Sequence, residues 1–264
     1  MTTQLPYLTT AIQAARAAGR IQRYHAGGEL EIDTKSTEID LVTQVDTACE
    51  ARIREIITGA HPDHAVLGEE GGQEGGSSSH RWIVDPLDGT INYAHDFPFY
   101  CVSIALEIDG ILEVGVVLDS VRGELFTAVR GQGAFVNGAP IDVSKESEPK
   151  KALLATGFSY RADLVRQNLE IFARLLPEVR SIRRPGAAAL DLCYVACGRL
   201  DGFWELGLNP WDAAAGVLII QEAGGSISGP SAEPYRLGMD VLVASNGHLH
   251  AKLLELLDLG YALA

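Results

Sequence analysis

Residues 82–93 constrain what this chain can fold into more than any other segment does. The first three are apolar and predict a short buried strand, which Pro86 is expected to end because proline cannot donate a ladder hydrogen bond. Asp85 then lies at a strand end, three residues before Asp88, and Gly89 allows a turn that presents backbone N–H groups. Two carboxylates beside such groups suit a hard cation that holds a phosphate. Asp-Pro and Asp-Gly equally suit an ordinary turn, so partners elsewhere in the chain must decide.

Further acids occur at positions where local structure is expected to begin or end. Glu69 directly follows the apolar run 65–67, which repeats the arrangement of acid after strand. Asp46 and Asp212 fall in the first turns of expected helices, where the helix dipole favours a carboxylate, so capping alone can explain both. Glu205 is a lone acid in an apolar strand, and burying an unpaired carboxylate is costly. Glu205 therefore favours a functional interpretation more than the capping acids do.

Length and charge limit the classes of function. With 264 residues, the chain suits one large domain or two closely joined halves. It has 21 Lys and Arg against 35 Asp and Glu, a net charge of −14, which opposes direct binding to nucleic acid or to an anionic membrane. The first residues have helical spacing rather than the pattern of a signal peptide, and no segment has the ~18 consecutive apolar residues of a membrane helix. These features predict a cytoplasmic protein with no membrane partner.

The cysteines and histidines do not form a recognisable soft-metal pattern. Cys49, Cys101, Cys193 and Cys197 lie in segments that look regular, and they are predicted to be buried small residues. The alternative is a ligand or redox pair, because Cys193 and Cys197 would share one face of a helix. The seven histidines are predicted to lie on the solvated surface.

The first part of the chain combines two helices with a run of strands. Asp109-Gly110 is a strong hairpin signal, and the strands around it predict an antiparallel meander. Residues 71–79 are rich in glycine and serine and are predicted to form a mobile surface loop, either a cover for the site or a passive connector. The expected helices are 5–25 and 46–58, and the expected strands are 65–67, 82–84, 100–108, 111–118, 123–129 and 134–136.

The second part alternates strands with helices, which implies sheet layers covered by helices. Residues 144–150 are charged and lack apolar side chains, so they predict a boundary between two halves, about 1–146 and about 151–264. The expected strands are 152–156, 179–182, 200–206 and 241–244, and the expected helices are 162–176, 188–197, 211–222 and 248–257.

Three separated motifs make the chain recognisable. Residues 68–70, 85–93 and 211–216 resemble the signature segments of the inositol monophosphatase family, in the same order. The resemblance extends over 35–46 and 186–205 and therefore spans nearly the whole chain. It implies an α+β fold, the layered α-β-α-β-α sandwich of the inositol monophosphatase and fructose bisphosphatase superfamily. It also implies two or three Mg²⁺ ions per site, with Mn²⁺ as an alternative, and carboxylates without histidine or thiolate do select such hard ions.

The resemblance also implies a role for individual residues. Asp46 would orient Thr90, which with Glu69 would position the attacking water, and Lys35 would place a positive charge near the metal. The implied metal ligands are Glu69, Asp85, the carbonyl of Leu87, Asp88 and Asp212. The implied contacts to phosphate and substrate are Gly89, Thr90, Gly186, Ala188, Glu205 and Asp212.

The implied activity is a magnesium-dependent, lithium-sensitive phosphomonoesterase that hydrolyses myo-inositol 1-phosphate and forms a homodimer. Residue 187 is alanine where many relatives carry Thr or Ser, which leaves the alcohol open. Histidinol phosphate, a sugar bisphosphate and a nucleotide 3′-phosphate are therefore alternative substrates. A non-catalytic partner of the transcription machinery is an alternative from another class. The basic cluster of Arg180, Arg183 and Arg184 is predicted to serve a substrate or a subunit neighbour.

Overall fold

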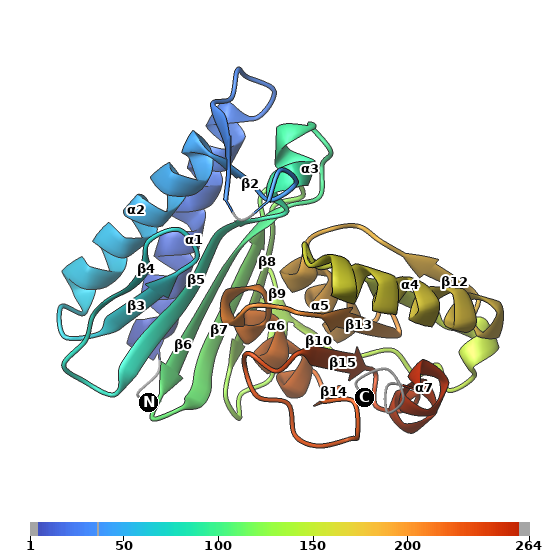
Figure 1. Cartoon of the computed structure of the whole chain (residues 1–264). Coiled ribbons are helices and arrows are strands. Elements are labelled where there is room, and N and C mark those ends of the chain that lie inside the picture. Colours follow the sequence, from blue (N-terminus) through green and yellow to red (C-terminus); the bar gives the residue numbers. More distant parts are fainter. Residues whose placement is uncertain (1–4, 36, 259–264) are drawn as a thin grey trace.

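The computed structural model describes residues 5–35 and 37–258, and its elements stack in five layers (Figure 1). Helices α1 and α2 cover one face of an eight-stranded sheet, and α5 and α6 lie between that sheet and a five-stranded sheet. Helices α4 and α7 cover the far face of the second sheet. The chain thus has the layered α+β architecture expected from its sequence. The helices are α1 Leu5–His25, α2 Gln44–Ala60, α3 Thr90–Ala94, α4 Ala162–Leu175, α5 Ala188–Ala196, α6 Pro210–Glu222 and α7 His250–Leu257, with 3-10 turns at Pro149–Lys151 and Leu176–Glu178.

The eight-stranded sheet has the order β10-β9-β8-β7-β6-β5-β3-β4, and the strands from β5 to β10 form the predicted antiparallel meander. Strands β3 and β5 are parallel neighbours, so their carboxyl ends meet at one edge of the sheet. These strands are β3 Ala65–Gly68, β4 Gly72–Gly75, β5 His80–Asp88, β6 Cys101–Ile108, β7 Ile111–Asp119, β8 Glu124–Val129, β9 Ala134–Val136 and β10 Ala139–Ile141.

The five-stranded sheet has the order β12-β11-β13-β15-β14 and mixes parallel and antiparallel pairs. A small antiparallel ribbon, β1 with β2, precedes α2. The strands are β11 Leu153–Thr156, β12 Ser181–Arg183, β13 Gly202–Leu206, β14 Ser226–Ser228 and β15 Val241–Ser245, and the ribbon is β1 Ile32–Thr34 with β2 Leu41–Thr43. Of these, β1 and β14 were not expected, because three residues without a strongly apolar run give no clear strand signal.

Two local predictions are wrong. Pro86 does not end its strand, because β5 continues to Asp88 through a bulge at which Asp85 faces Ser103 and Asp88 faces Cys101. Because the extra residue on β5 interrupts the hydrogen bonding between β5 and β6 at the bulge, proline removes no interstrand hydrogen bond there. Residues 71–79 are not wholly a loop, because β4 lies within them and pairs antiparallel with β3.

The prediction that all histidines are solvated is also wrong. His61, His64 and His80 stack on one another beside Tyr7 and Trp82, with ring centroids 4.7 Å apart for His61 and His64 and 4.2 Å apart for His64 and His80. His64 is only 5% exposed. We call these three residues the histidine cluster. It forms where the end of α2 and the starts of β3 and β5 meet α1, which the sequence spacing does not reveal.

Three of the four cysteines are fully buried, as expected, and Cys197 is half-buried. In the part of the chain that the structure describes, none of the helices has the length and apolar character needed to traverse a lipid bilayer.

Candidate active site

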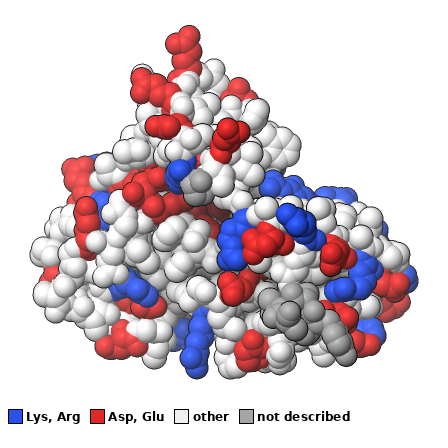
Figure 2. All heavy atoms as spheres, viewed as in Figure 1, with Lys and Arg blue, Asp and Glu red and all other residues white. Residues whose placement is uncertain are grey.

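A pocket of about 130 Å³ opens where the carboxyl ends of β3 and β5 face the N-termini of α5 and α6. Figure 2 shows acidic atoms gathered in the hollow at the centre of this face, with basic atoms along its edge. We call this the acid pocket. The acids that line it are Glu69, Asp85, Asp88, Asp191, Glu205 and Asp212. The predicted site residues Leu87, Gly89, Thr90, Gly186 and Ala188 also line it, so segments far apart in sequence meet here.

The bulge of β5 aims two carboxylates into the pocket. Asp85 is 2% exposed, and its Oδ1 accepts a hydrogen bond from the Leu87 N–H at 3.0 Å. Asp88 Oδ2 accepts one from the N–H of Ala189 in α5 at 2.8 Å. Burial raises the pKa of Asp85 well above its usual value, and the charges of Glu69 and Asp88 add to this effect. Burial likewise raises the pKa of Asp88 to about 7, although the bond from Ala189 opposes it.

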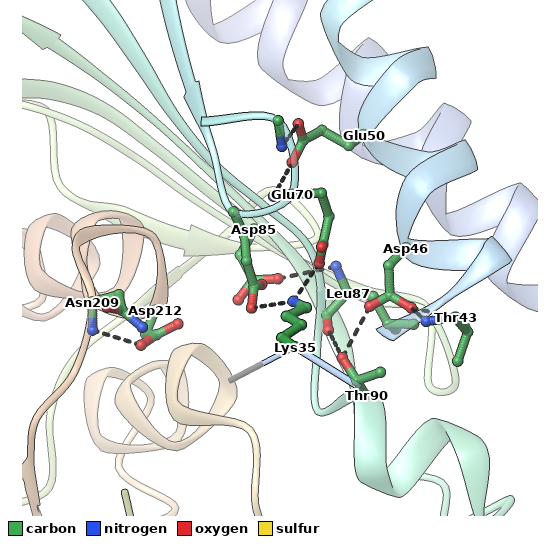
Figure 3. Close-up of polar contacts among 12 residues, drawn as sticks. Lys35, Thr43, Asp46, Glu50, Glu70, Asp85, Leu87, Thr90, Asn209 and Asp212 are labelled. Atoms are coloured by element: carbon green, nitrogen blue, oxygen red, sulfur yellow. Dashed lines mark hydrogen bonds and ion pairs between the residues drawn. The ribbon is translucent and has the colours of Figure 1, made fainter. Parts of the chain in front are cut away.

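Lys35 bridges the two acids that follow β3. Its Nζ donates to Glu69 Oε1 at 2.8 Å and to Glu70 Oε1 at 2.5 Å, so the predicted positive charge near the acids is present (Figure 3). Burial raises the pKa of Glu69 to about 7, against the lowering effect of Lys35. The turn itself is held by Glu50 of α2, which accepts from the N–H groups of Glu70 and Gly71, both at 2.8 Å. Glu50 was missed in the sequence because nothing local separates it from a surface helix acid.

Asp46 serves its helix and the pocket at the same time. Its Oδ2 accepts from the N–H and the hydroxyl of Thr43, at 2.9 and 2.6 Å, which caps α2. Its Oδ1 accepts from Thr90 Oγ1 at 2.9 Å. The Thr90 hydroxyl also lies 3.0 Å from the carbonyl oxygen of Leu87. Capping and the orientation of Thr90 are therefore compatible, because each uses a different oxygen of one carboxylate (Figure 3).

Gly89 connects the bulge to α3 in a conformation that side chains disfavour. Its φ is +93°, and a Cβ there would lie 2.9 Å from the carbonyl oxygen of Phe99. Asn92, one turn later, donates through Nδ2 to the carbonyls of Phe99 at 2.7 Å and Pro185 at 2.9 Å. These bonds fix the position of α3 relative to the loop before α5, where Gly186 lies.

Asp212 approaches from the opposite side, in the first turn of α6. Its Oδ2 accepts from the Asn209 N–H at 2.7 Å as part of a capping box, so the capping interpretation holds for Asp212 too. Burial raises its pKa to about 7, and the charge of Asp88 contributes. A folded cluster whose acids resist ionisation in this way is one that a cation would stabilise.

The donor set fits a hard divalent cation. Within residues 5–35 and 37–258, no group of three or more His, Cys, Asp or Glu side chains is arranged so that it could hold a metal ion as the side chains stand. The oxygen donors nevertheless line one small buried space, and their mutual repulsion is relieved if a cation lies among them. The residues that would hold Mg²⁺ or Mn²⁺ are Glu69, Asp85, Asp88, Asp212 and the carbonyl oxygen of Leu87.

The second sheet supplies the far wall of the pocket. Glu205 of β13 is 8% exposed, and burial, followed by the charge of Asp212, raises its pKa to about 8. Gly157 leaves room for the Glu205 carboxylate, because a Cβ at position 157 would lie 2.1 Å from Glu205 Oε2. Of the three clustered arginines, Arg184 lines the pocket. Asp191 of α5 also lines the pocket, and its Oδ1 has no hydrogen-bond partner among the described residues. The sequence analysis missed Asp191. Its spacing of three from Ala188, which puts both on one face of a helix, is the only sequence signal that could have indicated its place in the pocket.

The chain matches the model of the inositol monophosphatase family over residues 4–259. It is 45% identical over 253 residues to inositol-1-monophosphatase of Synechocystis sp., covering 95% of this chain and 88% of the relative. It is 47% identical over 234 residues to Nus factor SuhB of Pseudomonas aeruginosa, covering 84% and 85%. Its fold superposes on the crystal structure of extragenic suppressor protein suhB from Bartonella henselae with a TM-score of 0.92 and 39% identity, covering 96% and 99%. This chain belongs to the inositol monophosphatase family.

Proposed function

We propose that this protein is a magnesium-dependent phosphomonoesterase that hydrolyses myo-inositol 1-phosphate to inositol and phosphate. The observation that carries the proposal is the acid pocket, in which carboxylates at the ends of β3 and β5 and at the start of α6 surround one small space beside Thr90. The name of the Synechocystis relative, inositol-1-monophosphatase, supports the choice of ester.

In this proposal the residues of the chain bind and orient the reactants. When bound, Mg²⁺ supplies positive charge that neutralises the phosphate and lowers the pKa of water. The Thr90 hydroxyl donates to Asp46, so its oxygen is free to accept from the attacking water and to aim it at phosphorus. Glu69 is the proposed acceptor of the water proton, because its carboxylate and Thr90 line the same pocket. Gly89 exposes backbone to the phosphate without a side chain in the way.

Glu205 is the proposed recognition group for the alcohol. As a carboxylate, it accepts hydrogen bonds from ring hydroxyls, and its position on β13 opposite Asp212 puts it across the pocket from the cleaved bond. Ala187 adds no hydroxyl to this wall, so discrimination among alcohols rests on Glu205 and its neighbours.

A substrate panel tests the ester. Purified protein with Mg²⁺ is assayed on myo-inositol 1-phosphate, histidinol phosphate, fructose 1,6-bisphosphate and adenosine 3′,5′-bisphosphate, and kcat/KM is compared. We expect the inositol ester to be preferred by about tenfold or more, the discrimination that a few polar contacts supply. Equal or lower activity on it would refute the ester and leave the phosphatase proposal standing, whereas no activity on any ester would refute both.

Lithium inhibition tests the metal arrangement. We expect tens of millimolar LiCl to inhibit turnover by competing at the position that Asp212 completes. NaCl at the same concentration controls for ionic strength. Full activity in LiCl would contradict this part of the proposal.

A second candidate function is a partner of the transcription machinery, which the name Nus factor SuhB of the Pseudomonas aeruginosa relative supports. The net charge of −14 disfavours direct RNA binding, so the partner would be a protein. Tagged protein is used to capture RNA polymerase and its elongation factors, and the Asp85→Asn variant is compared. Capture by both would establish a role that does not need catalysis, and capture by neither would remove this candidate.

We also propose a cytoplasmic homodimer, which light scattering and fractionation would check.

A further inference from the structure

One buried residue of α1 contacts the strand that carries the acid pocket. The buried face of α1 follows helical spacing through Ala11, Ala15 and Ala18, and the next position on this face is Gln22. Gln22 is 0% exposed. Burying a glutamine on this alanine face is costly unless the amide is hydrogen-bonded. The hydrogen-bond partners of Gln22 therefore indicate why a polar residue is present here.

The amide of Gln22 holds the bulge of β5. Its Nε2 donates to the carbonyl oxygen of Pro86 at 2.8 Å and to that of Cys101 in β6 at 3.3 Å. Both carbonyls can only accept, so the nitrogen of the amide must face them. The amide oxygen accepts from the hydroxyl of Ser120, which follows β7. One side chain of α1 thus connects β5, β6 and the end of β7 where the β5–β6 pairing is irregular.

The position of Gln22 is itself fixed by close packing of α1. Gly19 lies about one turn earlier, and a Cβ there would lie 2.7 Å from Leu118 Cδ2 and 2.9 Å from Ser120 Oγ. A side chain at position 19 would therefore push α1 away from the end of β7. Tyr93 of α3 also holds the helix, because its hydroxyl donates to the carbonyl oxygen of Gln22 at 2.6 Å.

The peptide between Pro86 and Leu87 links Gln22 to the acid pocket. The carbonyl of this peptide accepts from Gln22, and its N–H donates to Asp85 Oδ1 at 3.0 Å (Figure 3). The peptide is trans and planar, so its C=O and N–H point to opposite sides. The amide of Gln22 and the carboxylate of Asp85 therefore hold one rigid unit from its two edges. A hydrogen bond to the carbonyl also strengthens the N–H as a donor.

We propose that Gln22 is a positioning residue of the active site, which orients the Pro86–Leu87 peptide so that Asp85 and the carbonyl of Leu87 are held in place for a divalent cation. The inference rests on the proposed function, from which it takes these two ligands. Leu87 O belongs to the next peptide along the chain and lies 3.0 Å from Thr90 Oγ1. Gln22 is not among the residues that line the acid pocket, so it acts through the backbone of β5.

Metal binding tests the proposal without relying on turnover. The full chain is freed of metal and is titrated calorimetrically with MnCl₂ and, separately, with MgCl₂. Gln22→Met keeps the length of the side chain and removes the amide, and methionine suits both a helix and a buried face. We expect the dissociation constant for each ion to rise about tenfold or more, the effect of losing a group that orients a metal ligand.

Ser120→Ala is a second variant, and it is milder because it removes one buried hydroxyl. The amide of Gln22 then keeps its donor but loses the contact that fixes its oxygen, so the dissociation constant should rise less, about threefold. Tyr93→Phe is the matched control, because it removes a buried hydrogen bond to Gln22 that does not involve the bulge. It should lower the melting temperature and leave the metal affinity unchanged.

Thermal melts establish that each variant is folded at the temperature of the titration. Wild-type affinity in folded Gln22→Met or in Ser120→Ala would overturn the proposal. Weakening by Tyr93→Phe equal to that by Gln22→Met would also overturn it, since the effect would then follow from lost stability alone. If the wild type itself binds neither ion, the proposed function fails instead.

Discussion

The acid pocket and the histidine cluster occupy opposite ends of the same two strands. Glu69 follows β3 and Asp88 ends β5, whereas His64 precedes β3 and His80 begins β5. Both regions crowd titratable side chains of one kind into buried space. They differ in whether the crowded side chains are stable in their neutral form. This difference distinguishes a region that would bind an ion from one that serves packing alone.

The histidine cluster is accommodated by ring stacking, by hydrogen bonds and by a neutral His64. Trp82 Nε1 donates to His64 Nδ1 at 3.1 Å, and the Tyr7 hydroxyl lies 3.3 Å from His80 Nε2. Burial lowers the pKa of His64 to about 4, and the neighbouring His80 and His61 lower it further in the same direction. An uncharged imidazole packs like another aromatic ring, so His64 needs no ion beside it.

The acid pocket has few hydrogen-bond donors that could satisfy its carboxylates. Burial raises the pKa values of Glu69, Asp88 and Asp212 to about 7 and that of Glu205 to about 8. At neutral pH these acids are therefore partly protonated and partly ionised, and a bound cation would stabilise the ionised form. The two regions therefore predict opposite dependences of stability on pH in the metal-free protein.

The largest expected effect is on turnover, from Asp85→Asn. The amide keeps the shape of the side chain but removes a ligand charge from the acid pocket, so kcat/KM should fall by about a thousandfold or more. The metal-free melting temperature should not fall, because burial already disfavours the charge of Asp85 and the amide keeps an acceptor for the Leu87 N–H. Steady-state kinetics and thermal melts measure the two effects. A variant with near-normal turnover would show that the pocket does not need this charge.

Thr90→Val should lower kcat by about a hundredfold, since the proposed acceptor for the attacking water is lost. Thr90→Ser is the matched control, because it keeps the hydroxyl that donates to Asp46 and should retain activity within about tenfold. If both variants behave alike, the Thr90–Asp46 hydrogen bond is structural only.

The free energy of unfolding of the metal-free protein should fall as the pH rises. The pKa of Glu205 is about 8 in the fold and 4.5 in its unperturbed state, so the fold holds this proton more tightly than the unfolded chain does. The contribution is complete below about pH 4.5 and is lost as the pH rises through about 8. Glu205→Gln cannot titrate, so its loss of stability between pH 5.5 and 8.5 should be smaller by about 3 kcal/mol.

Urea unfolding at several pH values measures this slope. Exposed Glu255→Gln is the control and should keep the wild-type slope. Saturating Mg²⁺ should abolish or reverse the slope, because it stabilises the ionised acids. A wild-type protein that gains stability with pH in the absence of metal would contradict the raised pKa values.

The sequence predicted five of the six acids that line the acid pocket, all but Asp191, because each of the five follows a local signal. Glu69 follows a short strand, Asp212 begins a helix, and Glu205 interrupts an apolar strand. The resemblance to a family then joined signals that lie far apart in the chain. The longer helices and most strands were likewise predicted, because their periodicity and their glycine stops are local properties, whereas the five-residue α3 was not.

The remaining features depend on contacts between distant segments. The bulge at Pro86 is allowed by its pairing with β6, and β4 exists because β3 offers an edge. The histidine cluster requires α1 to bring Tyr7 against residues more than fifty positions later. Glu50 is distinguished from a surface acid by the turn that it holds. None of these has a local pattern, so a single sequence cannot reveal them.

The smallest expected effect is on acid stability, from His64→Gln. The pKa of His64 is about 4 in the fold and 6.5 in its unperturbed state, so its contribution to stability is present above about pH 6.5 and is lost as the pH falls through about 4. The groups that face it are His61, His80, Asp63, Tyr7 and Trp82.

Glutamine keeps an acceptor for Trp82 Nε1 and does not titrate. Some packing is lost at pH 7.5, but the further loss between pH 7 and 5 should be smaller than in the wild type by about 2 kcal/mol. His95→Gln, at an exposed position after α3, is the control and should follow the wild type. The measurement is made in saturating Mg²⁺, so that the acid pocket is held ionised and its slope does not contribute. An unchanged slope for His64→Gln would mean that the histidine cluster opens before it takes up a proton, and the contrast between the two ends of β5 would then lie in their packing rather than in their charge.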